Sequence, residues 1–157
     1  MKIQLTVIGK TNQDFVQKGL DEFCGRLKHY IPFELDIIPD IKNAKNLSQE
    51  QQKEKEGELI LKNIQAGDYV VLLDERGKEF SSLQFAGYIE KKKHVVTKKM
   101  IFIIGGPYGF SKKIYEMASE KVSLSKMTFS HQMIRLIFVE QLYRAMTILN
   151  KEPYHHE

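Results

Sequence analysis

The segment that most limits the possible folds is a short apolar run, Met100 to Ile104, which ends abruptly in Gly105 and Gly106. An unbroken apolar run of this length is typical of a strand buried on both faces, as strands are in parallel α/β sheets. Ligands of such sheets bind just outside the carboxyl ends of the strands, where loops converge. Glycine allows the backbone to approach a ligand closely. The loop after Ile104 is therefore the first candidate binding site.

Strand-like and helix-like segments alternate along the remainder of the chain. A capping box formed by Ser48 and Gln51 marks the beginning of one helix. This alternation predicts an α/β fold with a mostly parallel sheet flanked by helices, and the length suits a single domain, 1–157. The expected strands are 3–8, 32–38, 69–73 and 100–104, and the expected helices are 12–30, 48–64, 81–93, 112–121 and 130–150, with a polar loop at 41–46.

The helices differ in how their apolar residues are arranged. The first turns of helix 48–64 are highly charged and lack an apolar stripe, so we expect them to be solvated. Helix 130–150 is apolar on nearly every side, but Arg135, Glu140 and Arg144 interrupt it and it is too short to span a bilayer. It is expected to be buried all round, or to pack against a partner subunit with one face. The apolar side of helix 12–30 consists of Phe15, Val16, Leu20, Phe23, Cys24 and Leu27.

The glycine loop has two interpretations when it is taken alone. Gly105 to Gly109 has neither the G-x-G-x-x-G spacing of a dinucleotide site nor the Lys-Ser/Thr ending of a P-loop. Ser111 can cap the next helix by accepting from its free N–H groups. The loop is therefore as consistent with a plain strand-to-helix turn as with a binding loop.

Charge is distributed unevenly along the chain. Residues 1–90 contain 12 Lys and Arg against 15 Asp and Glu, a balance of −3, whereas residues 91–157 contain 12 against 5, a balance of +7. A basic half that also carries the glycine loop suits a polyanion such as RNA. The alternative is that the lysine runs at 91–93 and 98–99 only contact water, as most charged faces do.

Cysteine content and the N-terminus indicate the cellular compartment. The single cysteine, Cys24, excludes a disulfide within one chain and favours a reducing environment. Met1 to Gly9 is a short strand rather than the apolar core of a signal peptide. We expect a cytoplasmic protein without a membrane segment.

Four motifs, in this order, resemble one known family: I-I-G-G-P-Y-G-F-S at 103–111, L-S-K-M-T-F-S-H-Q-M-I-R-L at 124–136, V-E-Q-L-Y-R-A at 139–145 and P-Y-H-H-E at 153–157. Together with the opening M-K-I-Q-L-T-V-I-G-K, they are similar to the ribosomal large-subunit methyltransferase H family, which is of the SPOUT class. The resemblance covers the whole chain. It implies a homodimer whose fold contains a C-terminal deep trefoil knot, although strands and helices as a rule do not thread through loops.

The resemblance also implies an activity. Members use S-adenosyl-L-methionine, and release S-adenosyl-L-homocysteine, to methylate N3 of a pseudouridine in the helix 69 loop of large-subunit ribosomal RNA within assembled ribosomes. No metal is expected. Two alternatives are a SPOUT methyltransferase with another RNA target and a non-enzymatic module that binds RNA or ribosomes.

The family's donor site transfers to three separate segments of this sequence. A flat and largely apolar adenine ring suits such a set, because backbone amides of converging loops can bind its edge while leucines contact its faces. A leucine that ends a strand is more often a core residue, so Leu73 alone would carry little weight. The implied donor-binding residues are Leu73, Gly105, Leu124, Ser125, Lys126, Met127, Thr128 and Phe129.

The C-terminal residues are the candidates for proton transfer and RNA contact. His155 can take or relay the N3 proton near neutral pH, and Tyr154 can stack on an extruded base. The alternative is that these last residues are disordered. Arg135 and Arg144 match arginines of the family and are candidates for RNA or partner contact, the alternative being a buried arginine paired with Glu140.

Two residues depart from the family pattern. Ser130 replaces a proline before the last helix, which should loosen the helix start slightly. His156 replaces a basic residue, which puts a phosphate contact at that position in doubt.

Overall fold

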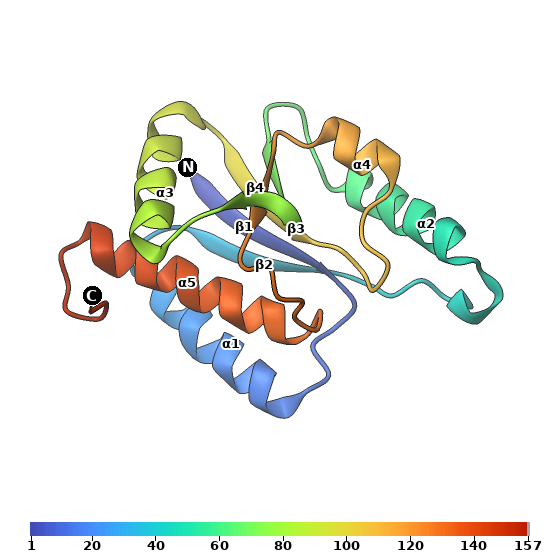
Figure 1. Cartoon of the computed structure of the whole chain (residues 1–157), viewed down its shortest axis with the longest axis horizontal. Coiled ribbons are helices and arrows are strands. Elements are labelled where there is room, and N and C mark those ends of the chain that lie inside the picture. The colour runs from blue at the N-terminus through green and yellow to red at the C-terminus, as the bar shows by residue number, and fades with distance from the viewer. Residues whose placement is uncertain (157) are drawn as a thin grey trace.

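In the computed structural model, which describes residues 1–156, five parallel strands form one sheet in the order β2-β1-β4-β3-β5 (Figure 1). Every strand expected from the sequence is present, and the parallel α/β architecture is confirmed. The strands are β1 (Lys2–Ile8), β2 (Phe33–Ile38), β3 (Tyr69–Glu79), β4 (Lys99–Ile104) and β5 (Glu120–Ser123).

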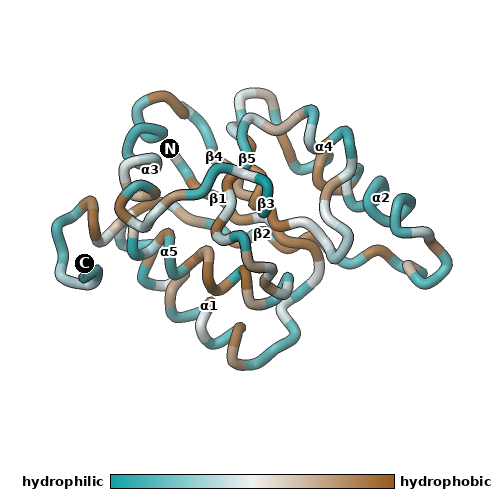
Figure 2. Tube along the Cα trace, viewed as in Figure 1, coloured by the Kyte–Doolittle hydropathy of each residue, from teal (hydrophilic) through white to brown (hydrophobic). Residues whose placement is uncertain are grey.

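Helices cover both faces of the sheet. α1 (Asp14–Leu27), α3 (Ser82–Val95) and α5 (Met133–Leu149) pack on one face, and α2 (Gln49–Lys62) and α4 (Lys112–Met117) pack on the other (Figure 1). The apolar run of β4 contributes to both cores: Met100 and Phe102 lie in the first cluster and Ile101 and Ile103 in the second. The continuous apolar character of this strand therefore follows from burial on its two faces. In Figure 2 brown segments gather among the central strands, whereas α2 is largely teal.

α5 lies between α1 and α3, which is why its sequence is apolar on nearly every side. None of its residues from Met133 to Leu149 is exposed, and eight of these 17 residues are buried in the single chain. Contact of its remaining face with a partner subunit stays a prediction. Ser130, in place of the family's proline, helps to begin it: the Ser130 hydroxyl accepts a hydrogen bond from the Met133 N–H at 3.1 Å.

The structure corrects four expectations about the elements. The helix expected at 112–121 ends at Met117, and residues 120–123 form β5 beside β3, because a strand of four residues has too short a pattern to recognise. The polar loop at 41–46 contains a short 3₁₀ helix, η1 (Ala44–Asn46). Phe15 is 58% exposed instead of joining the apolar side of α1. The charged start of α2 is solvated only in part, since Glu56 is buried against the glycine loop.

No helix within residues 1–156 is long and apolar enough to cross a membrane. The trefoil knot stays a prediction that rests on the resemblance.

Arg135 is a structural residue of the core and not an RNA contact. Its side chain is among the largest that are fully buried, and its guanidinium donates to the carbonyls of Ile8 at 2.7 Å and Gly9 at 2.8 Å and to the Thr11 hydroxyl at 3.1 Å. Its Nε donates to the His131 carbonyl at 3.0 Å. These bonds join the end of β1 to the start of α5. The candidate RNA role of Arg135 is therefore wrong, because a buried guanidinium cannot reach a phosphate.

Replacement of Arg135 by methionine is expected to lower the free energy of unfolding by roughly 3–5 kcal/mol, because buried acceptors lose their donor. Urea denaturation measures this change. Arg26→Met is the matched control, since the Arg26–Glu22 ion pair lies on the surface and contributes little. Equal stability of the two variants would contradict the structural role.

Candidate functional site

Three segments meet at one edge of the sheet: the loop after β4, the loop after β5, and residues 73–76 of β3, where the pairing of β3 with β5 is interrupted. They surround a cavity of about 550 Å³, here called the strand-end cavity. Its size lies within the range of roughly 300–1,000 Å³ that is typical of small-molecule and cofactor sites. The lining consists of residues 73–76, 104–110, 124–125 and 127–131, with Tyr115 and Ile134.

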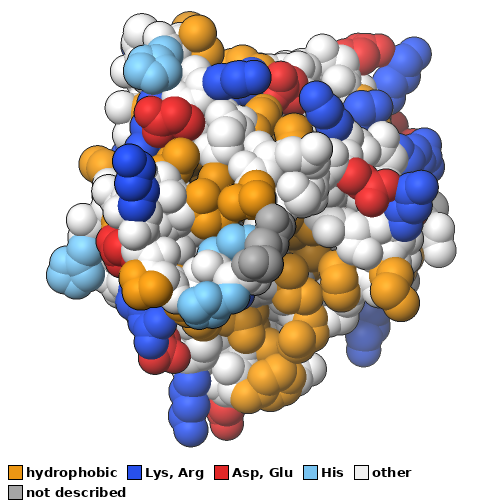
Figure 3. All heavy atoms as spheres, turned by 60° about the vertical axis from the view of Figure 1, so that its left-hand side comes forward, with side chains coloured by type: hydrophobic (Ala, Val, Ile, Leu, Met, Phe, Trp, Pro, Cys, Tyr) orange, Lys and Arg blue, Asp and Glu red, His pale blue; other side chains and the backbone are white. Residues whose placement is uncertain are grey.

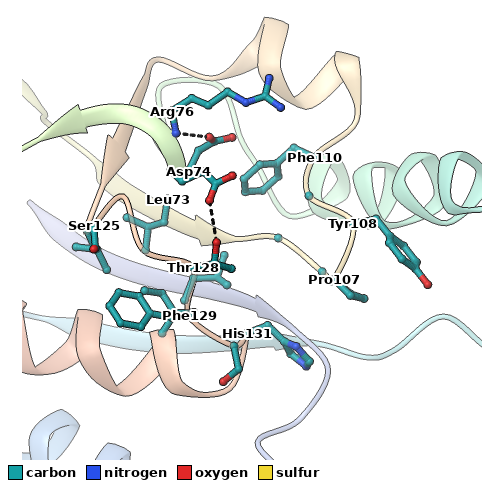
Figure 4. A pocket seen from close by; sticks show the side chains of 18 of the residues that line it. Leu73, Asp74, Arg76, Pro107, Tyr108, Phe110, Ser125, Thr128, Phe129 and His131 are labelled. Atoms are coloured by element: carbon teal, nitrogen blue, oxygen red, sulfur yellow. Dashed lines mark hydrogen bonds between the residues drawn. The ribbon is translucent and has the colours of Figure 1, made fainter.

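The structure brings together seven of the eight residues that the resemblance assigns to the donor. Figure 4 shows Leu73, Ser125 and Phe129 on one side of the cavity and Pro107 and Tyr108 on the opposite side. The seven residues that line the cavity are Leu73, Gly105, Leu124, Ser125, Met127, Thr128 and Phe129.

Lys126 is the exception among these eight residues. Its side chain is 84% exposed, and its ammonium lies 3.7 Å from the Glu79 carboxylate outside the cavity. The loop is shaped locally instead by Ser125, whose hydroxyl accepts from the Met127 N–H at 3.0 Å, while its carbonyl accepts from the Ser123 hydroxyl at 2.9 Å. A side-chain contact from Lys126 to a molecule in the cavity is therefore not supported by the structure.

Two acidic residues in the middle of β3, Asp74 and Glu75, supply the polar part of the cavity, and the sequence analysis missed them. The Tyr115 hydroxyl donates to the Asp74 carboxylate, and burial together with this bond raises the pKa of Tyr115 to about 12. Asp74 also accepts from the Arg76 N–H at 2.8 Å, and the Thr128 hydroxyl donates to Glu75 at 3.2 Å (Figure 4). Ligands of parallel sheets bind beyond the carboxyl ends of the strands, and both carboxylates directly follow the strand expected at 69–73. The same reasoning that pointed to the loop after Ile104 therefore points to them as well.

These features define the kind of molecule that the strand-end cavity can hold. Its walls contain leucine, isoleucine, phenylalanine and methionine side chains, and the carboxylates of Asp74 and Glu75 lie at one side. Apolar walls suit a flat ring, and the carboxylates suit a positively charged group on the same molecule. Within residues 1–156 no group of three or more His, Cys, Asp or Glu is placed to hold a metal ion.

A buried carboxylate supports the glycine loop from behind. Glu56 of α2 is only 3% exposed, and its Oε1 has no hydrogen-bond partner. A β-carbon at Gly106 would lie 2.5 Å from that carboxylate, so a larger residue there requires the Glu56 side chain or the loop to shift. Gln52 donates to the other oxygen at 3.3 Å. Burial, with a contribution from Asp40, raises the pKa of Glu56 above its ordinary value, so the fold favours the neutral carboxyl group.

Glu56 should make stability depend on pH. A carboxyl group whose pKa is raised by folding stabilises the fold fully below its unfolded pKa, and that stabilisation is lost as pH rises through the folded pKa. Glu56→Gln is therefore expected to remove part of the decline in melting temperature above about pH 4.5. Thermal unfolding between acidic and neutral pH measures it, with exposed Glu58→Gln as control. The same pH profile in wild type and Glu56→Gln would refute the assignment.

The C-terminal residues pack on their own chain, and none of residues 150–156 lines the strand-end cavity. The Tyr154 hydroxyl donates to Glu140 at 2.9 Å, and its ring meets that of Tyr143 edge to face with centroids 4.8 Å apart. Burial and the bond to Glu140 raise the pKa of Tyr154. Glu140 and Tyr143 lie in the middle of α5, whereas the cavity is lined by Ile134 in the first turn of this helix and by the residues before it. Tyr154 and His155 therefore do not line the cavity of their own chain.

Arg144 connects this tail to α5. Its guanidinium donates to Glu140 at 2.6 Å, lies 3.1 Å from His155 Nδ1, and stands over the Tyr154 ring at 4.7 Å from the centroid. The pairing with Glu140 is thus found at Arg144 and not at Arg135. Residue 157, the end of the P-Y-H-H-E motif, lies outside the described residues.

Comparison with known proteins relates the whole chain to one family. A family model described as "Predicted SPOUT methyltransferase" matches residues 1–155. Proteins of Parabacteroides distasonis, Phocaeicola vulgatus and Bacteroides thetaiotaomicron are 69%, 64% and 59% identical, over 100% of this chain and 100% of each relative. Each of the three is named ribosomal RNA large subunit methyltransferase H.

Proposed function

The chain belongs to the SPOUT methyltransferase family, and from this premise we propose that it methylates large-subunit ribosomal RNA with S-adenosyl-L-methionine as donor. The proposed acceptor is N3 of a pseudouridine in the helix 69 loop of the assembled ribosome. The observation that carries the proposal is the strand-end cavity, in which seven residues of three separate loops that match the family's donor motifs meet.

The residues of the cavity fit the proposed donor. Leu73, Leu124 and Ile134 provide apolar contact for an adenine ring, and the loop backbones provide polar groups for its edge. Asp74 and Glu75 lie where carboxylates can attract the cationic sulfonium or amino group of the donor. When bound, the donor supplies an electrophilic methyl group. The chain's own residues bind it, orient it and exclude water, and such positioning can lower the barrier by roughly 7–11 kcal/mol.

A second copy of the chain completes the proposed site. Tyr154 and His155 contact α5 at Glu140 and Arg144, six and ten residues after Ile134 at the cavity, or about 9 and 15 Å along the helix. The tail of the same chain has to move by about that much to reach the cavity, and we propose that the tail of a partner reaches it instead. Apolar side chains gather over the middle of the face that carries the C-terminal residues (Figure 3). We place the homodimer contact on this face.

In this dimer the tail acts on the acceptor. Tyr154 stacks on the extruded base, and the Nδ1 atom of His155, once it has parted from the Arg144 guanidinium, takes the proton that leaves N3. Arg144 positions both, since its guanidinium contacts the Tyr154 ring and the His155 imidazole. We propose that this dimer is located in the cytoplasm.

The proposed function is tested by methylation of ribosomes that lack the pseudouridine methyl group. The purified protein and S-adenosyl-L-methionine should add one methyl group per large subunit, and mass spectrometry of RNA fragments should place it on the helix 69 loop. Transfer RNA in a parallel reaction separates this function from a SPOUT enzyme with another target. Lack of any transfer, together with no heat of binding for S-adenosyl-L-homocysteine, would instead support a non-enzymatic RNA-binding module.

A further inference from the structure

A second cleft, of about 620 Å³, lies between α3 and the adjoining ends of β3 and β5. It is lined by basic and aromatic residues and is here called the lysine cleft. We infer that the lysine cleft binds the phosphate backbone of the RNA that flanks the target nucleotide. This inference rests on the proposed function, because it extends the RNA contact of the same enzyme. The lining residues that matter are Lys78, Glu79, Phe80, Tyr88, Lys91, Lys92 and Glu120.

The lysine cleft contains more ammonium groups than carboxylates that could pair with them. Among the described residues, neither Lys78 nor Lys91 has a carboxylate within ion-pair distance, and both lysines are exposed. The two acids of the cleft are already paired: Glu120 lies 2.9 Å from the Lys92 ammonium, and Glu79 lies 3.7 Å from that of Lys126. The charge left over is therefore positive, as a polyanion requires.

The floor of the cleft is rigid and aromatic. The rings of Phe80 and Tyr88 are tilted against each other, with centroids 4.9 Å apart, and the Lys78 ammonium lies 5.2 Å from the Phe80 centroid. The Tyr88 hydroxyl donates to Glu120 at 2.5 Å, which holds the ring in place. Lysines above aromatic rings in a groove are a recurrent feature of proteins that bind nucleic-acid strands.

The lysine cleft continues the strand-end cavity along the same chain segments. Lys78 and Phe80 follow the cavity residues 73–76 on β3, and Val122 of the cleft precedes Leu124 of the cavity. The Glu79–Lys126 ion pair joins the two rims. A strand of RNA whose target base reaches the cavity therefore has the cleft beside it, so its neighbouring phosphates can meet Lys78 and Lys91.

The test compares two double variants with equal loss of charge. Lys78→Gln/Lys91→Gln removes the unpaired amines of the cleft, and Lys45→Gln/Lys62→Gln removes two exposed lysines from η1 and α2. We expect the cleft variant to bind ribosomes roughly tenfold more weakly at 0.1 M salt, and its log–log salt slope to fall by about 1.4–1.8. Affinity for S-adenosyl-L-homocysteine and kcat at saturating ribosomes should stay unchanged, because the cleft lies outside the donor cavity.

Two results separate failure of this inference from failure of the proposed function. If the wild type methylates ribosomes but the two double variants bind them with equal affinity and salt slope, the lysine cleft has no role in RNA binding. If the wild type binds ribosomes without methylating them, the proposed function fails. The salt slopes of the two variants then still decide whether the cleft contacts RNA.

Discussion

Truncation after Lys151 is expected to lower kcat for ribosome methylation by at least about 100-fold, the usual range for loss of a group that transfers a proton. The truncated chain should still bind S-adenosyl-L-homocysteine with nearly wild-type affinity, because no residue after 151 lines the strand-end cavity. Single-turnover methylation and calorimetric titration of the same preparation measure both quantities.

Because the tail also packs on α5 through Tyr154, truncation could lower kcat by disturbing the structure. A point variant separates this effect from loss of the group that takes the proton. His155→Ala keeps that packing and should reproduce most of the loss of kcat. When His155→Ala is mixed with a second variant that cannot bind the donor, part of the activity should return. In the mixed dimer, one site combines the intact cavity of the first subunit with the intact tail of the second. Unchanged turnover in the truncated protein would remove the tail from the mechanism.

Gly106→Ala is expected to weaken binding of S-adenosyl-L-homocysteine by at least about tenfold. The new β-carbon would lie 2.5 Å from the Glu56 carboxylate. Because Glu56 is only 3% exposed and has little room to give way, we expect the glycine loop to move. A displacement of about 1 Å in a positioning element can reduce the rate roughly 100-fold. The rate of methyl transfer should therefore fall more than the affinity does, and the two are measured by the same pair of assays.

A second substitution shows whether the clash is the cause. Gly106→Ala combined with Glu56→Ala removes the carboxylate and should restore most of the donor affinity. Gly87→Ala on α3 is the control, since a β-carbon there meets no atom within 4 Å. The proposed support of the loop by Glu56 is wrong if the double variant binds no better than Gly106→Ala alone.

The sequence predicts the sheet well and its edge poorly, for a physical reason. A strand such as β4 is covered on both faces, so its apolar run is visible without any knowledge of its neighbours. β5 has four residues, and it becomes a strand only by pairing with β3, which sequence periodicity cannot show. Phe15 is similar, since its place on α1 is apolar by pattern but is left uncovered in a single chain.

The sequence predicts which chain segments form the candidate site better than it predicts which side chains point into it. Glycines and strand ends located the cavity, because backbone geometry determines where parallel strands end. The direction of a loop side chain depends on tertiary contacts, so Lys126 was assigned to the cavity although it pairs with Glu79 outside it. Arg135 was assigned to RNA although the end of β1 buries it, and β1 is remote from it in sequence.

The central claim is that the strand-end cavity holds an adenosyl sulfonium donor, and a crystal structure with S-adenosyl-L-homocysteine tests it most directly. The account predicts the adenine between the loops at Leu73, Gly105 and Leu124, and the amino group toward Asp74 or Glu75. Ligand density at any other place on the protein, or none at saturating concentration, would contradict it.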